Sequence, residues 1–163
     1  MSGKPVQTAS PPLPPITTLP GCLGIVRPRR GSLGWPFTAA LAGGVMVAVV
    51  VGSLNPFPPL SGWMLIAALV LWQPATEELL FRGLLQGYLA RTPLGQRSRL
   101  GFSAANGITS LVFTAIHFLH QPPLWALGVF IPSLLFGYFR DLTGSIWPSL
   151  LLHVAFNAAF FLT

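Results

Sequence analysis

Residues 63–90 read WMLIAALVLWQPATEELLFRGLLQGYLA, an apolar run that contains two adjacent carboxylates, Glu77 and Glu78, followed by Arg82. A helix needs about 20 residues to cross the hydrocarbon core of a bilayer, so this run is long enough to span it. Each charged side chain at the centre of such a helix costs about 2.5 to 3.5 kcal/mol on insertion scales. A helix that only anchors a protein in the membrane does not need charged residues at its centre. The run therefore predicts a membrane helix that contains functional residues.

The whole chain has the composition of a membrane protein. Its 163 residues are 52% hydrophobic and only 7% charged, whereas a soluble domain carries about 25% charged residues. The net charge of +6 does not indicate nucleic-acid binding, because the basic residues form short clusters between long apolar runs, which is the pattern of membrane topology. The single Cys22 excludes an internal disulfide and a multi-cysteine metal site. The expected surroundings of the protein are therefore the lipid bilayer.

Four further apolar segments accompany the first, at residues 37–54, 102–119, 124–139 and 146–162. Open sheets cannot satisfy their backbone in lipid, so each segment is expected to be a helix. The chain is thus predicted to be all-α, a polytopic membrane bundle of about five transmembrane helices over residues 35–163. Residues 1–34 contain seven prolines and are predicted to be a disordered, Pro-rich basic tail, because this density of proline prevents helix and sheet.

The loops between the segments differ in charge. The loops at residues 55–62 and 120–123 contain no Lys or Arg. A path of five spans places the clustered arginines on the side that holds the N-terminus, and the positive-inside rule then predicts a cytoplasmic N-terminus. These arginines are Arg27, Arg29, Arg30, Arg91, Arg97, Arg99 and Arg140.

Three more polar residues lie within the apolar segments. His153 and Asn157 are four residues apart and share one face of the last helix, where they could also serve as hydrogen-bonding groups between helices. His117 lies late in the third segment. Reaching the depth of Glu77 requires the third helix to begin near Ala104 or to be tilted, given a rise of about 1.5 Å per residue.

Together these side chains suit hydrolysis of an acyl bond by an activated water. Glu77 can act as a general base, and a histidine can hold the water and shuttle its proton. Histidine and asparagine donors can stabilise the oxyanion of a tetrahedral intermediate. Glu77, His117 and His153 could alternatively hold a divalent metal such as zinc with an open position. Glu78 and Arg82 are four apart and indicate an ion pair along the helix.

Three motifs resemble those of the CAAX-protease and bacteriocin-processing (CPBP, Abi) family of intramembrane proteases. Residues 77–82, EELLFR, match EExxxR; residues 113–117, FTAIH, match FxxxH; and residues 153–157, HVAFN, match HxxxN. The resemblance covers about residues 63–160 and implies a glutamate-dependent intramembrane endopeptidase that uses no metal. By motif position it implies water activation by Glu77 and His117, an oxyanion hole from His153 and Asn157, and support from Glu78 and Arg82.

The predicted number of spans is smaller than in many members of that family, and the chain looks like its short bacterial forms. The resemblance therefore implies a membrane-anchored protein substrate, removal of a C-terminal sorting tail, and a place in the bacterial inner membrane. Two alternatives stay open. One is a non-enzymatic bacteriocin immunity protein of the same family. The other is a small transporter with an intramembrane carboxylate relay, against which the lack of an internal repeat argues.

Overall fold

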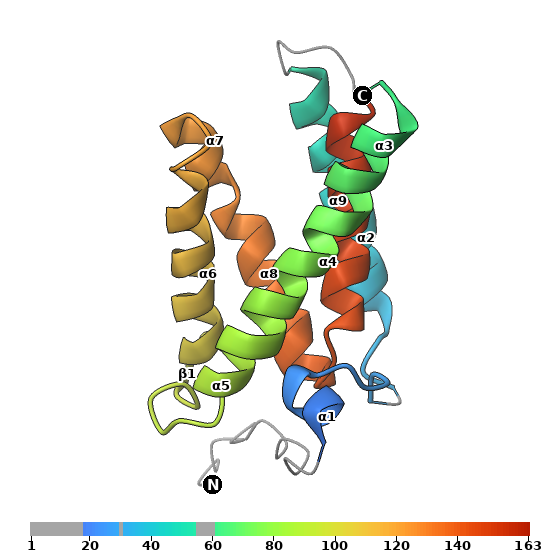
Figure 1. Cartoon of the computed structure of the whole chain (residues 1–163). Helices are drawn as coiled ribbons and strands as arrows, with labels where there is room; N and C mark the ends of the chain where they lie inside the picture. Colours follow the sequence, from blue (N-terminus) through green and yellow to red (C-terminus); the bar gives the residue numbers. More distant parts are fainter. Residues whose placement is uncertain (1–17, 30, 55–60) are drawn as a thin grey trace, which may run out of the picture.

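The computed structural model describes residues 18–29, 31–54 and 61–163, and this part of the chain is almost entirely helical (Figure 1). Apart from a short N-terminal helix, it consists of five helical segments that correspond to the five predicted apolar segments. The prediction of an all-α membrane helix bundle is confirmed. The predicted disorder of residues 1–17 lies outside the described residues.

The first two segments are both long enough to cross a membrane. Helix α2 (Trp35–Ser53) has 19 residues. The second segment is a continuous helical rod made of α3 (Trp63–Ile66), η1 (Ala67–Trp72), α4 (Gln73–Glu77), η2 (Glu78–Gln86) and α5 (Gly87–Leu89). The elements η1 and η2 have the wider π-helical turn, which is rare and is frequent at functional sites. Pro74 lies at the start of α4 and removes one backbone donor from the rod.

The third segment follows a small hairpin of β1 (Ser98–Arg99) and β2 (Phe102–Ser103). Its turn is possible because Leu100 and Gly101 both have positive φ angles, of 53° and 84°. Helix α6 (Ala104–His117) then begins at Ala104, as predicted for a helix that places His117 at the depth of Glu77. The hydroxyl of Ser103 caps it by accepting from the N–H of Asn106 at 2.9 Å.

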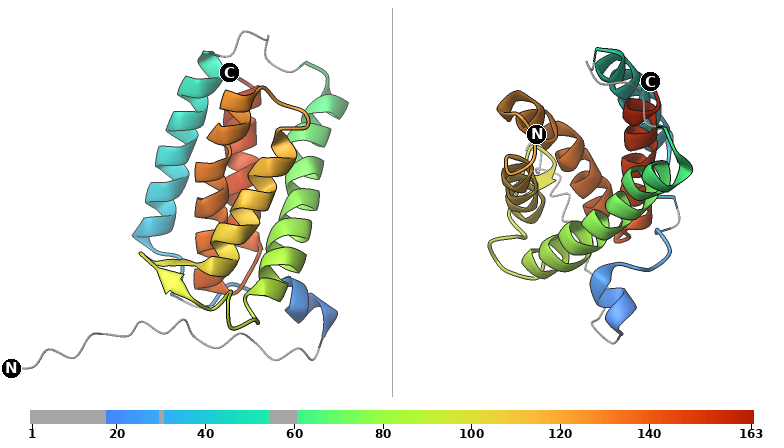
Figure 2. Two further views of the ribbon diagram at one scale, coloured as in Figure 1. Left: turned by 90° about the vertical axis from the view of Figure 1, so that its left-hand side faces the viewer. Right: turned by 45° about the horizontal axis from the view of Figure 1, so that its top comes forward.

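The last two segments are α7 (Pro123–Gly128) with α8 (Phe130–Thr143), and α9 (Trp147–Phe161). Helix α9 packs along α2 and α8 around a core of Phe37, Phe136, Phe139 and Leu152. The views in Figures 1 and 2 show that α6 and α7 stand apart from α2, α3 and α9 at one end. The elements α1, α5 and β1 lie at the other end of the bundle.

The distribution of polar and apolar side chains is that of a protein in lipid. Within the described residues, three helices are long and apolar enough to cross a membrane: Trp35–Ser53, Trp63–Leu89 and Pro123–Thr143. Helix α9 is a shorter apolar helix. Large apolar side chains such as Met46, Leu71 and Ile131 are exposed, whereas Glu78 and Arg82 are fully buried. Hydrophobic burial against water therefore does not organise this bundle, and polar contacts between helices contribute to its specificity.

The N-terminal segment departs from the prediction. Helix α1 (Leu19–Leu23) forms with Pro20 in its first turn and the Thr18 hydroxyl as its cap, so the prediction that proline prevents helix is wrong here. Proline is tolerated in the first turn because the N–H groups of that turn have no partner inside the helix. The segment is also tied to the bundle, since the N–H of Ile146 donates to the Gly24 carbonyl at 2.9 Å.

Candidate active site

The centre of the site is the imidazole of His153 on α9, which lies between the carboxylates of Glu77 and Glu78. Its Nδ1 is 3.0 Å from Oε1 of Glu78, and its Nε2 is 3.6 Å from Oε2 of Glu77. The two glutamates fall on either side of the imidazole because successive helical residues point about 100° apart. The Glu78 side chain is fully buried, whereas the Glu77 side chain is 18% exposed. Of the two side chains only that of Glu77 is thus partly exposed, and its Oε2 atom is itself buried.

Packing on aromatic rings fixes the plane of this imidazole. The ring of His153 is stacked on Phe136 of α8, with centroids 4.8 Å apart. Phe113 of α6 approaches it edge-on at 6.1 Å. Aromatic contacts of this kind favour defined ring orientations. Two helices other than the one that carries His153 therefore hold its nitrogen atoms towards the glutamates.

Each glutamate has a further partner. Oε1 of Glu77 accepts from Nε2 of Gln73, one turn earlier, at 2.9 Å. Oε2 of Glu78 forms an ion pair with Nε of Arg82 at 3.4 Å, and neither side chain is exposed. The ion pair expected from the EExxxR spacing is present. Arg82 also donates from Nη2 to the backbone carbonyl and hydroxyl of Ser133, at 3.0 and 2.8 Å, which joins the site to α8.

Asn157 of α9 forms a hydrogen bond with the backbone of the rod of residues 63–89. Its Nδ2 donates to the carbonyl of Leu69 at 3.0 Å. In the π-helical turn a carbonyl bonds to the N–H five residues later, and for Leu69 that residue is Pro74, which has no N–H. Asn157 therefore supplies the donor that the proline lacks. One N–H of its amide remains for another acceptor, since the group has two.

His117 stands at the end of α6, across from this cluster. Its Nδ1 lies 2.8 Å from the carbonyl of Phe113, and because a carbonyl can only accept, Nδ1 carries the donated hydrogen. The Nε2 of a neutral His117 is then an acceptor. Its ring packs on Phe113 at 4.4 Å, the same ring that His153 contacts. Among the contacts of the described residues, none joins His117 directly to Glu77.

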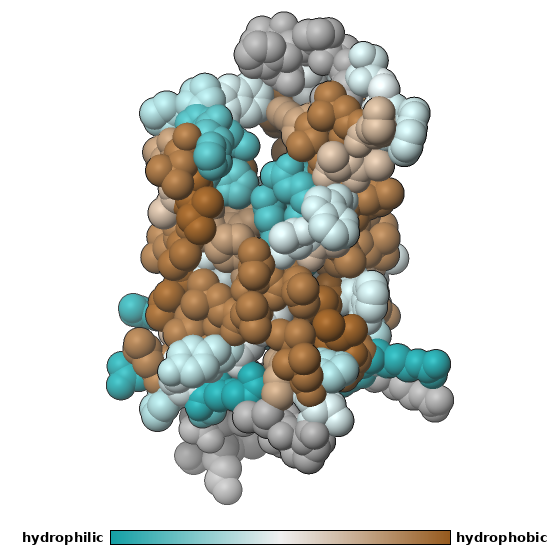
Figure 3. Space-filling view, in the orientation of Figure 1, coloured by the Kyte–Doolittle hydropathy of each residue, from teal (hydrophilic) through white to brown (hydrophobic). Residues whose placement is uncertain are grey.

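The surface is hollowed between α6–α7 and α3–α4, and hydrophilic residues lie on both sides of the hollow (Figure 3). Glu77, at the end of α4, is partly exposed and His117, at the end of α6, is half-buried. A water molecule needs polar partners to occupy such a site. The arrangement offers a polar, open space in a protein whose remaining lipid-facing surface is apolar.

The geometry also bears on the alternative metal set of Glu77, His117 and His153. Within the described ranges, no three His, Cys, Asp or Glu side chains come together as a group that could hold a metal ion. A zinc site needs three or four ligands at about 2.0–2.3 Å from one point. The residues as placed do not fit a bound metal.

A family comparison decides the wider identity. Residues 58–159 match the family described as type II CAAX prenyl endopeptidase Rce1-like. The chain belongs to this family. The match spans all three motifs and confirms the predicted resemblance to CAAX proteases. At the level of the family it supports an intramembrane protease. No curated protein matches the chain, and no solved structure does.

This Rce1-like protein has a second buried polar group that the sequence reasoning missed. Gln86 of η2 donates from Nε2 to the Gly137 carbonyl at 2.9 Å and to Asp141 at 2.8 Å. The other oxygen of Asp141 accepts from the hydroxyl of Ser103 at 2.6 Å. Gln86 lies four residues after Arg82, so continued i, i+4 spacing of polar residues could have indicated it. Gln73, four residues before Glu77, follows the same rule.

Proposed function

We propose that this protein is a glutamate-dependent intramembrane endopeptidase, which hydrolyses a peptide bond in or near the membrane segment of a protein substrate. The observation that carries the proposal is the imidazole of His153 held between Glu77 and Glu78, with the Glu77 side chain partly exposed. A carboxylate at this position is a suitable general base for water.

The proton positions follow from the contacts of His153. A carboxylate only accepts, so the short contact with Glu78 places the hydrogen on Nδ1. The Nε2 of the neutral ring is then an acceptor that faces another acceptor, Oε2 of Glu77, at 3.6 Å. Two acceptors at this separation can each receive a hydrogen bond of about 2.8 Å from one water. Oε2 of Glu77 is itself buried and has no hydrogen-bond partner within the described residues, and we propose that a water entering from the hollow binds there as the nucleophile.

The reaction balances with these groups. The water oxygen bonds to the carbonyl carbon of the scissile peptide, and Glu77 takes the proton that the water loses. The oxyanion that forms is stabilised by hydrogen-bond donors, for which the second N–H of Asn157 is our candidate. The carbon–nitrogen bond then breaks, and the proton held by Glu77 passes to the nitrogen of the leaving amine, which regenerates the carboxylate. The products are a new carboxyl terminus and a new amino terminus.

His117 and the buried ion pair have supporting parts in this proposal. His117 lies across the hollow with Nε2 available as an acceptor, so it can receive the proton from Glu77 and relay it to the leaving amine. Glu78 keeps His153 in the required tautomer, as a carboxylate does for a catalytic histidine. Arg82 neutralises Glu78 at the buried side. Every step uses side chains of the protein, and the proposal involves no metal.

The substrate we propose is a protein with a short membrane-spanning tail, such as a C-terminal sorting signal made of small residues, an apolar span and terminal arginines. We place the enzyme in a bacterial inner membrane with its N-terminus in the cytoplasm. The gathering of Arg29, Arg91 and Arg140 at one end of the bundle supports this orientation.

The test is cleavage of membrane-anchored reporters that carry such tails, co-expressed with the wild-type protein or with Glu77→Gln. We expect a shortened reporter with the wild type and only the full-length reporter with the variant, at equal abundance of the two proteins in the membrane. Equal cleavage by both would remove Glu77 as the base. Protection against a bacteriocin by both proteins, without cleavage by either, would establish an immunity protein instead.

A further inference from the structure

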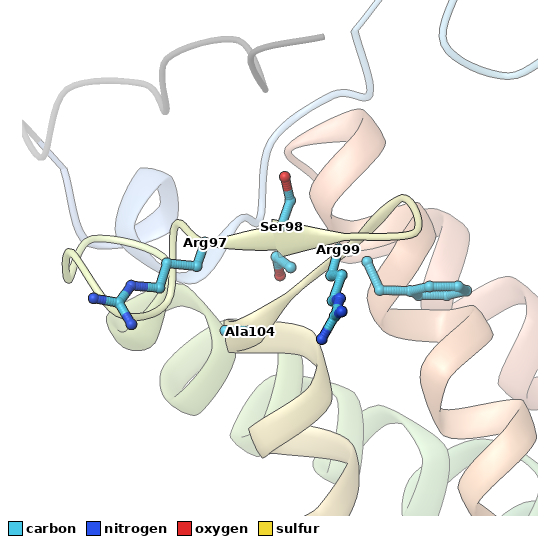
Figure 4. Close-up of a pocket in the computed structure, with 6 residues that line it drawn as sticks. Arg97, Ser98, Arg99 and Ala104 are labelled. Atoms are coloured by element: carbon cyan, nitrogen blue, oxygen red, sulfur yellow. The ribbon is translucent and has the colours of Figure 1, made fainter. Parts of the chain in front are cut away.

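A pocket with a volume of about 510 Å³ lies at the hairpin before α6 (Figure 4). It is at the end of α6 opposite to His117, so it is separate from the candidate active site. The pocket is lined by Arg97, Ser98, Arg99, Phe102, Ser103 and Ala104.

The charge of the pocket comes from two guanidinium groups. Arg97 directly precedes strand β1 and Arg99 is its last residue, and the two side chains point in different directions. Figure 4 shows their side chains on either side of Ala104. Both residues are exposed, and within the described part of the chain neither has an ion-pair or hydrogen-bond partner for its guanidinium. Because both side chains are long and exposed, an anion in the pocket can gain two planar cationic donors when the two guanidinium groups turn towards it.

The backbone donors at this end of α6 do not provide that attraction. The N–H of Ala104 donates to the Arg97 carbonyl at 2.7 Å, and the N–H of Ala105 donates to Gly95 at 3.1 Å. The nearby carboxylate of Asp141 lies behind the pocket wall and takes hydrogen bonds from Ser103 and Gln86. Binding of an anion therefore depends on the two arginine side chains.

The surroundings of the pocket are apolar. Leu100 at the tip of the hairpin is 93% exposed, Leu94 is 52% exposed and Phe102 is 39% exposed. The hairpin connects the rod of residues 63–89 to α6, so it lies where the membrane helices end. Apolar side chains next to basic ones are typical of a surface that inserts into the region between headgroups and acyl chains. A soluble anion would not use these apolar residues, whereas a phospholipid would.

We propose that this pocket binds the headgroup of an anionic phospholipid, with Arg97 and Arg99 as partners of the phosphate and with Leu100 and Phe102 against the acyl chains. Basic pockets at the ends of membrane helices bind anionic headgroups in this way. The inference does not depend on peptide hydrolysis and stands if the proposed enzyme activity fails.

A lipid bound in the pocket would also contact a hairpin that is linked to the helix carrying both glutamates. Ser103 lines the pocket and donates to Asp141, which accepts from Gln86 on η2. Gln86 lies four residues after Arg82, the partner of Glu78. The headgroup would thus order a hairpin that is hydrogen-bonded to the helix carrying both glutamates.

The experiment is native mass spectrometry of the full chain in detergent, titrated with phosphatidylglycerol, phosphatidylcholine or inorganic phosphate. We expect the wild-type protein to retain phosphatidylglycerol in preference to phosphatidylcholine. Arg97→Gln and Arg99→Gln should each weaken phosphatidylglycerol binding about fivefold, and the double variant about 25-fold, which is the effect of removing one or two basic residues near an anionic surface. Arg27→Gln, which removes an exposed charge outside the pocket, is the control and should change binding by less than about twofold.

Two results would overturn the proposal. One is equal loss in Arg27→Gln and in the pocket variants, which would show that only net charge matters. The other is equal retention of both lipids by the wild-type protein, a result that needs no variant to fold. Competition by inorganic phosphate at the same concentration as lipid would show a free-anion site and reject the lipid headgroup as the ligand.

Discussion

The imidazole of His153 lies 3.0 Å from Glu78 and 3.6 Å from Glu77, so one side chain of α9 contacts two successive residues of the rod of residues 63–89. The two contacts differ in kind. The shorter one is to a fully buried carboxylate, and the longer one is to a carboxylate that is 18% exposed. The two adjacent glutamates therefore differ in their surroundings, since one side chain is fully buried and the other is partly exposed.

This difference predicts that the same substitution has a large effect on stability at position 78 and a small one at position 77. Glu78→Gln should lower the free energy of unfolding by about 3 to 5 kcal/mol, because it leaves the buried Arg82 without its counter-charge. Glu77→Gln should change stability by less than about 1 kcal/mol, because its side chain is partly exposed and the amide oxygen can still accept from Gln73. Thermal unfolding of both variants in the same detergent measures this difference, and equal destabilisation would contradict it.

The contact between Asn157 and Leu69 predicts a coupling with Pro74. Asn157→Ala should destabilise the protein by about 1 to 3 kcal/mol, because the Leu69 carbonyl loses its only side-chain donor. In the background of Pro74→Ala the same substitution should cost less, because residue 74 then has an N–H for that carbonyl.

A double-mutant cycle from thermal unfolding measures the coupling, and additive effects within about 0.5 kcal/mol would show that the two residues are independent. Measuring cleavage activity distinguishes the structural role of Asn157, its hydrogen bond to Leu69, from its proposed role in stabilising the oxyanion. If its second N–H stabilises the oxyanion, Pro74→Ala restores stability to Asn157→Ala without restoring activity.

The close packing of α6 on α8 predicts a strong effect at one glycine. A Cβ on Gly137 would meet the side-chain amide of Asn106, which is buried and donates to the Leu134 carbonyl at 3.0 Å. Gly137→Ala should therefore lower the free energy of unfolding by about 1 to 3 kcal/mol. The matched control is Gly43→Ala in α2, where nothing lies within 4 Å and where alanine is favoured by about 0.5 to 1 kcal/mol. Equal unfolding temperatures of the two variants would contradict the packing.

The proposed mechanism predicts that metal removal has no effect on cleavage. Protein treated with a strong chelator and exchanged into metal-free buffer should cleave a reporter at the rate of untreated protein. Loss of activity that Zn²⁺ restores would show that Glu77, His117 and His153 form a metal site. Such a result would also require those three side chains to move together from their present positions.

Much of the fold could be predicted from the sequence, because apolar segments of membrane length define helices with few alternatives. The positions of the five segments, the start of α6 at Ala104 and the ion pair between Glu78 and Arg82 all followed from length, rise and spacing. The π-helical turns did not follow from the sequence, and the hydrogen bond from Asn157 to the Leu69 carbonyl in η1 joins residues that lie far apart in the chain. The helix at Leu19–Leu23 was missed because its contacts are to residues far along the chain.

The candidate site was predicted as a set of residues but not as an arrangement. Periodicity places His153 and Asn157 on one face of α9, yet it does not say that the histidine meets both glutamates or that the asparagine meets a backbone carbonyl. The network of Gln86, Asp141 and Ser103 was missed for the same reason, since its members are separated by up to 55 positions in the chain. Contacts between helices depend on how each helix is rotated about its axis and how deep it lies in the membrane. Neither quantity can be read from the periodicity of a single sequence.

The most direct test of the account is the rate at which purified protein releases the tail of a reporter, with mass spectrometry of the new carboxyl terminus. We predict a single new terminus in or next to the membrane segment for the wild-type protein. For Glu77→Gln we predict a rate lower by about 10²- to 10⁴-fold, the usual contribution of a general base. A variant that releases the same product within tenfold of the wild-type rate would contradict the central claim that Glu77 activates the water.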